Sequence, residues 1–146
     1  MYSIDYSSDD KVVRVNFQGL ISLKQILGVS NEVIKNSQLS VIKILSDIRQ
    51  ASFDFKVREL DNVISSTKPI WRPQSKIFEA ILINSPKDTA LIILLELRRR
   101  RESHISKIFC TEESALDWLN SPFISTFRSN TYKAAENLPA ERIDRI

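Results

Sequence analysis

The chain has 146 residues, the size of one domain, and its 42% hydrophobic and 27% charged residues are ordinary for a globular protein. This composition argues against a disordered chain. A formal net charge of +3 is too small to predict nucleic-acid binding by itself.

The start of the sequence shows no positively charged segment followed by an apolar one, which argues against a signal peptide. The longest apolar run, residues 90–95, is too short to span a bilayer. The single cysteine, Cys110, cannot form an intramolecular disulfide, which favours a reducing compartment. We therefore expect a cytoplasmic protein without a transmembrane segment.

The first elements predicted are an antiparallel hairpin and a helix. Alternating apolar residues predict strands over 2–6 and 11–18, the second ended by Gly19. Apolar residues at helical spacing then predict a helix over 22–36.

A buried strand is predicted next, because 41–45 is apolar apart from Lys43 and mostly β-branched. It breaks into polar residues at Asp47 and Arg49, which predicts a charged strand end at the sheet edge. A helix over 56–66 and a loop over 67–75, which contains two prolines, follow.

Two further strand–helix units complete the pattern. Strands are predicted over 76–83 and 106–110. Ser85 followed by proline predicts the start of a helix that runs to about residue 101, and Thr111 predicts the N-cap of a last helix that ends near residue 119.

The element order is therefore ββαβαβαβα, which predicts one α/β domain over residues 1–122. We expect a mixed sheet, an N-terminal antiparallel hairpin plus parallel strands, with about four helices mainly on one face. Residues 123–146 form a C-terminal extension, either partly packed through Phe123, Ile124 and Phe127 or loosely ordered.

This order, together with certain residues, resembles the STAS-related, SpoIIAA-like domains of bacteria over about residues 1–120. The residues that carry the resemblance are Leu45–Arg49, Phe53–Phe55, Asn84–Pro86, Ile108–Phe109, Ala115 and Trp118–Leu119. The resemblance implies a mixed sheet of four or five strands and a non-enzymatic role. That role is the binding of a protein partner, or of a small apolar or anionic ligand as in distant lipid-carrier relatives.

The chain departs from the family at the position of its regulatory serine. Anti-sigma-factor antagonists carry Asp-Ser-Ser/Thr-Gly at the start of the second helix, where a serine is phosphorylated. Here the corresponding residues are Asp54–Val57, with no hydroxyl or glycine after Asp54. The resemblance therefore does not extend to a phosphate switch at this position.

Five candidate site residues lie near the end of the central strand. Asp47 and Arg49 are two residues apart, so their side chains point the same way, either as a pocket wall where Arg49 meets an anion or as a structural ion pair. Asp54 is a candidate N-cap, and Asp54, Phe55 and Lys56 together are a candidate partner surface.

Trp71 and Arg72 lie in the proline-containing loop, where they fit an interface anchor or a lid over a ligand. The alternative is that Trp71 folds back over the sheet edge. The run Arg98–Arg101 wraps around the end of its helix and complements the helix dipole. Without interleaved aromatic residues, this run does not predict binding to nucleic acid or membranes.

The helix before that run is apolar on more than one face, which favours a subunit contact. We expect Ala90, Ile93 and Leu97 to face the sheet and Ile92 to meet a partner, as in a homodimer.

No catalytic or cofactor motif is found. His104 and Cys110 are each the only residue of their kind, and an inert buried thiol is a commoner finding than a catalytic pair. The only glycines, Gly19 and Gly28, are too few for a Walker loop or a dinucleotide fingerprint. The sequence predicts no metal, no cofactor and no enzymatic activity.

Two functional hypotheses remain. The first is a regulatory or scaffold module that engages a protein partner through Asp54, Phe55 and the second helix. The alternative is a carrier of a small apolar or anionic ligand, held between sheet and helices, with Arg49 or Arg72 neutralising an anionic head group.

Overall fold

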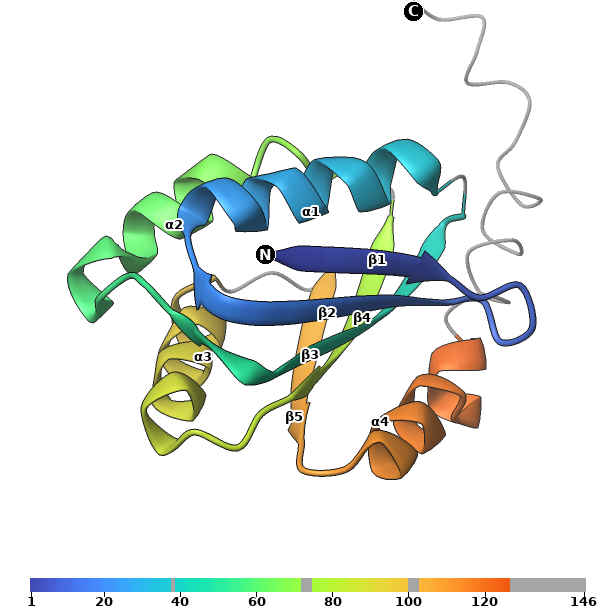
Figure 1. Ribbon diagram of the computed structural model, residues 1–146. Coiled ribbons are helices and arrows are strands. Elements are labelled where there is room, and N and C mark those ends of the chain that lie inside the picture. Colours follow the sequence, from blue (N-terminus) through green and yellow to red (C-terminus); the bar gives the residue numbers. More distant parts are fainter. Residues whose placement is uncertain (38, 72–74, 100–102, 127–146) are drawn as a thin grey trace, which may run out of the picture.

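The computed structural model of the chain describes residues 1–37, 39–71, 75–99 and 103–126 (Figure 1). Its elements, in chain order, are β1 (Tyr2–Tyr6), β2 (Val12–Ile21), α1 (Leu23–Asn36), β3 (Val41–Phe53), the 3-10 helix η1 (Val57–Glu59), α2 (Leu60–Thr67), β4 (Lys76–Leu82), α3 (Pro86–Arg99), β5 (His104–Phe109) and α4 (Glu112–Leu119). The α/β class and the element order predicted from the sequence are confirmed.

The strands form one five-stranded sheet in the order β1-β2-β3-β4-β5. Strand β1 is antiparallel to β2, and the other neighbouring pairs are parallel. Each parallel strand is added on the same side of the one before it. Because strand–helix–strand crossovers are right-handed, their helices then all lie on one face of the sheet. Helices α1, α2 and α3 connect these pairs, whereas α4 follows the last strand and lies across the strands from α1 and α2 (Figure 1).

Each face of the sheet has its own hydrophobic core. The core under α1–α3 includes Val15, Val33, Ile44, Leu60 and Ile77. The core under α4 includes Phe78, Ala80, Ala115, Leu119 and Ile124. The two cores are separate because side chains alternate between the faces along each strand.

Strands β2 and β3 are longer than predicted. Strand β2 continues past Gly19, whose φ of +77° is a conformation that glycine adopts without strain. Strand β3 continues from Leu45 through the charged residues to Phe53. The register between the two strands shifts between Asn16 and Gln18, so that β3 contains one extra residue there. Polar side chains in 47–50 therefore mark a bulge in a continuing strand, and the prediction that the strand ends there was wrong.

Buried Asp88 fixes the end of β3 against α3. Its carboxylate accepts hydrogen bonds from the Ser52 hydroxyl, at 3.0 and 3.2 Å, and from the backbone N–H of Phe53 at 3.2 Å. Asp88 is only 1% exposed, and it lies in the first turn of α3, where a negatively charged side chain interacts favourably with the helix dipole.

The orientation predicted for α3 was wrong. Ile92 is 6% exposed and belongs to the core under α1–α3, while Ile93 and Leu97 are 48% and 66% exposed. The buried stripe follows Asp88, Leu91 and Ile92, which are three and four residues apart. The sequence is apolar on both sides of this helix, so its pattern does not distinguish the two orientations. Ile92 is therefore not available to a partner on the surface.

After α4, residues 122–126 form a helical turn, in which Ile124 is 1% exposed and Phe123 is 56% exposed. Predictions that concern Arg72, Arg100, Arg101 and 127–146 fall outside the described residues. None of the helices in the described part of the chain is long and apolar enough to cross a membrane.

Candidate functional site

A cavity of about 110 Å³ lies between the sheet and helices α1–α3 and is partly open to the surface. Most of its wall is apolar and comes from strands β2–β4 and the three helices. The apolar lining includes Phe17, Ile21, Ile26, Val29, Ile44, Ile48, Phe53, Phe55, Val63, Ile81, Ile92 and Leu95. Protein interiors seldom contain voids much larger than a water molecule, so a space of this size is unusual in a core.

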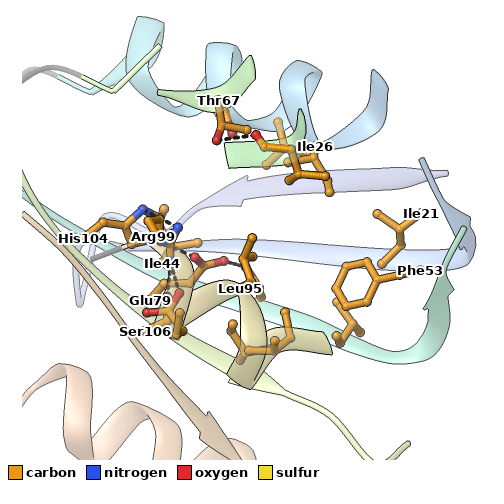
Figure 2. Close-up of a pocket in the computed structure, with 18 of the residues that line it drawn as sticks. Ile21, Ile26, Ile44, Phe53, Thr67, Glu79, Leu95, Arg99, His104 and Ser106 are labelled. Carbon is orange, nitrogen blue, oxygen red and sulfur yellow. Dashed lines mark hydrogen bonds and ion pairs between the residues drawn. The ribbon is translucent and has the colours of Figure 1, made fainter. Parts of the chain in front are cut away.

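One end of the cavity is polar. Figure 2 shows Glu79, Arg99, His104 and Ser106 gathered there, away from Ile21 and Phe53 at the other end. The strand register explains this grouping, because Glu79 of β4 lies between Ile44 of β3 and Ser106 of β5. His104 lies two residues before Ser106 and therefore faces the same side of the sheet.

Glu79 is the centre of the polar cluster. One carboxylate oxygen accepts a hydrogen bond from the Ser46 hydroxyl at 2.7 Å, and the other lies 2.9 Å from Nε2 of His104. A carboxylate away from bulk water is costly unless it is hydrogen-bonded, and here both oxygens have a partner.

Arg99 approaches the cluster from α3. Its Nη1 lies 3.0 Å from Nδ1 of His104, and its Nη2 donates to Ser106 Oγ at 2.9 Å and to Glu96. A guanidinium has no acceptor, so Nδ1 of His104 must accept this bond. The contacts thus match the neutral imidazole that carries its proton on Nε2 and donates it to Glu79.

The Glu79 carboxyl is ionised well into the acid range. Burial raises its pKa, but the hydrogen bond from His104, the electrostatic attraction of His104 and Arg99, and the bond from Ser46 together lower the pKa from 4.5 to about 2.

We expect the Glu79 carboxyl to contribute to the loss of stability of the protein at acid pH. Because its pKa is lowered by folding, the stability it contributes is complete above about pH 4.5 and is lost as the pH falls towards 2. The difference between the two pKa values corresponds to roughly 3 to 4 kcal/mol. Urea denaturation at a series of pH values should therefore show a smaller loss of stability below pH 4.5 in Glu79→Gln than in the wild type.

Asp10 provides the comparison for this experiment. The hydrogen bond from Arg14 lowers its pKa to about 2 as well, against the smaller opposing effect of burial. Asp10→Asn should remove the part of the stability loss below pH 4.5 that is due to Asp10, and should leave the part that is due to Glu79. An acid slope in Glu79→Gln equal to that of the wild type would contradict the assignment.

Asp47 and Arg49 do not contribute to the cavity. They form an ion pair at 2.6 Å, and the hydrogen bond from Arg49 lowers the pKa of Asp47. Asp47 alternates with the cavity-lining Ser46 and Ile48 and so points to the opposite face of the sheet. The structure favours the structural alternative considered for this pair.

Two of the other predicted residues do line the cavity. Phe55 is buried in its wall, and the ring of Trp71 lies edge-on to that of His104, with 5.3 Å between the ring centroids. Trp71 therefore packs at the polar end. Asp54 and Lys56 are exposed, and Lys56 holds the N-cap position of η1, so Asp54 does not cap this helix as predicted.

The residues of the polar cluster were not predicted as a site. The signal that could have revealed it is Glu79, a charged residue in the middle of the apolar strand KIFEAIL. A strand covered on both faces is almost continuously apolar, so an acidic residue inside it needs partners. The other members have no local signature.

His104 and Cys110 lie at opposite ends of β5, six residues or roughly 20 Å apart, which excludes a direct catalytic pair. The thiol of Cys110 is exposed, contrary to the expected burial. Among the residues that the structure describes, no group of three or more His, Cys, Asp or Glu side chains is arranged to hold a metal ion.

No protein-family model matches the chain. A search of curated proteins likewise finds no match. Among solved structures, the chain is similar to the anti-sigma factor antagonist SpoIIAA in its unphosphorylated form, with 13% sequence identity and a TM-score of 0.44. The similarity covers 83% of this chain and 99% of that chain.

Proposed function

We propose that this protein is a binding protein without enzymatic activity, and that it holds a small, mostly apolar molecule in the cavity between the sheet and α1–α3. The observation that carries the proposal is the cavity itself, whose wall is apolar except at one end. Ligand pockets in proteins commonly combine an apolar lining with a few polar groups that orient the ligand.

The apolar wall of the cavity supports this role. A ligand that fills the space removes apolar side chains from contact with water, which contributes roughly 25 cal/mol per Å² of apolar surface buried. Engineered apolar cavities of about 150 Å³ bind molecules such as benzene.

Trp71 provides a direct test, because it lines the cavity whereas Trp118 packs on Phe78 and Phe109 across the sheet. In a Trp118→Phe variant, titration with benzyl alcohol should change the fluorescence of Trp71 in a saturable way. Native mass spectrometry of protein purified from its own host should show a reproducible additional mass. The absence of a saturable response to all four of toluene, benzyl alcohol, benzylamine and benzoate would contradict the proposal.

A protein partner is the second candidate function, supported by exposed apolar side chains on neighbouring helices. Val57, Ile93 and Leu97 are all more than 40% exposed, and Arg98 joins α3 to η1 by donating to the Val57 carbonyl at 3.2 Å. A homodimer through this surface, and not through the buried Ile92, is part of this second candidate. Loss of a partner or of self-association in Val57→Glu, with the fold intact, would support this candidate.

A further inference from the structure

Helix α1 contributes one polar side chain, Ser30, to the wall of the cavity. The other α1 residues that line the cavity are Ile26 and Val29. Val33 and Ile34, which lie one helical turn after Ser30 on the same face, are also apolar and buried. Ser30 therefore places a hydroxyl on the otherwise apolar, inward-facing side of this helix.

The Ser30 hydroxyl has no hydrogen-bond partner among the residues that the structure describes, although Ser30 is only 4% exposed. Serine and threonine hydroxyls inside helices often donate to the carbonyl four residues earlier, as Thr67 of the same cavity does to Val63 at 2.9 Å. Ser30 makes no such bond. A buried hydroxyl without a partner is unfavourable, so this one needs an explanation.

Water is a weak partner for this hydroxyl. A water molecule inside a protein is usually held by about two to four polar groups. A water bonded to Ser30 finds no second polar side chain on this face of α1, where the neighbours are Ile26, Val29 and Val33. A ligand group that replaces a poorly held water and makes the same hydrogen bond gains affinity.

We infer that Ser30 is a ligand-contacting residue, and that the molecule held in the cavity carries a hydroxyl or carbonyl oxygen that hydrogen-bonds to it. This inference rests on the proposed function and specifies the chemical class of its ligand, an apolar molecule with an oxygen on the side that faces α1. A serine hydroxyl both donates and accepts, so it can pair with either kind of oxygen. A pure hydrocarbon leaves Ser30 without a partner.

The stability of Ser30→Ala separates a role in binding from a role in the fold. In the protein without ligand the Ser30 hydroxyl has no partner among the described residues to lose, and alanine is the better helix former. Ser30→Ala should therefore melt at the same temperature as the wild type or higher, as followed by circular dichroism. Ser46→Ala should melt at a lower temperature, because the Ser46 hydroxyl donates to Glu79 at 2.7 Å.

The binding test uses toluene and benzyl alcohol, two probes that differ by one hydroxyl. Dissociation constants are measured from Trp71 fluorescence in the Trp118→Phe background and confirmed by isothermal titration. Ser30→Ala should weaken the binding of benzyl alcohol by about threefold to tenfold, which is the net contribution of one hydrogen bond. The dissociation constant of toluene should stay within about twofold, because toluene makes no hydrogen bond to lose.

Ser65→Ala is the matched control, because it also removes a hydroxyl from a helix. Ser65 is exposed on α2 and donates to the Asn62 carbonyl at 3.2 Å, away from the cavity lining. This variant should leave both dissociation constants unchanged.

Three results would overturn the inference and leave the proposed function standing. They are unchanged benzyl alcohol binding in Ser30→Ala, equal weakening of both probes, and a melting temperature lowered as much as in Ser46→Ala. If toluene, benzyl alcohol, benzylamine and benzoate all fail to bind to the protein with Ser30 intact, the proposed function itself is overturned.

Discussion

Glu79→Ala is expected to reduce the free energy of unfolding by about 3 kcal/mol, since it removes two hydrogen bonds to a charged group and each such bond contributes roughly 1.5 to 3 kcal/mol. The substitution removes the acceptor of the Ser46 hydroxyl and of the His104 Nε2 proton. Both residues are about 5% exposed, so only water that enters the cavity can take the place of the carboxylate. Urea denaturation followed by circular dichroism would measure the loss as a lower midpoint.

Two comparisons separate this cost from a general effect of shortening a glutamate. Glu113→Ala, on the exposed surface of α4, should change stability by less than about 0.5 kcal/mol. Glu79→Gln keeps an oxygen that can accept one of the two bonds, so it should fall between alanine and the wild type. A loss below about 1 kcal/mol in Glu79→Ala would mean that the polar cluster does not form in solution.

The fold of this chain could be predicted largely because its signals are local. The Ser85-Pro86 helix start and the Thr111 cap are each defined within a few residues, and they lie where predicted. The prediction of the end of β3 was wrong for the same reason. Polar residues after a buried run look like a strand end, and only the pairing with β2 keeps the strand continuous to Phe53.

The site could not be predicted in the same way, because its polar members come from four separate elements. Ser46, Glu79, Glu96 and His104 lie on β3, β4, α3 and β5 and are brought together only by strand register and helix packing. Of these, Glu79 alone is anomalous within its own element. The sequence therefore shows that Glu79 needs hydrogen-bond partners, but it does not show which residues these are.

A larger side chain in the cavity is expected to maintain or raise stability, whereas a larger side chain in the packed core under α4 should lower it. Two neighbouring residues of β3 allow these effects to be compared. Ile44 lines the cavity, whereas the next residue, Leu45, belongs to the core under α4. Ile44→Phe adds atoms that can enter the empty space, so stability should be unchanged or rise by up to about 1 kcal/mol. Leu45→Phe inserts the same ring into a packed core and should cost about 1 to 3 kcal/mol.

The same pair tests whether the cavity is the binding site. Ile44→Phe should weaken the binding of benzyl alcohol at least tenfold, because the new ring occupies the space that the ligand needs. Leu45→Phe should leave the dissociation constant within twofold at a temperature where the variant is folded, since its ring lies across the sheet. Isothermal titration or Trp71 fluorescence would measure both. If Ile44→Phe were as destabilising as Leu45→Phe, the space beneath α1–α3 would be filled by side chains in solution, and the argument for a ligand there would lose its basis.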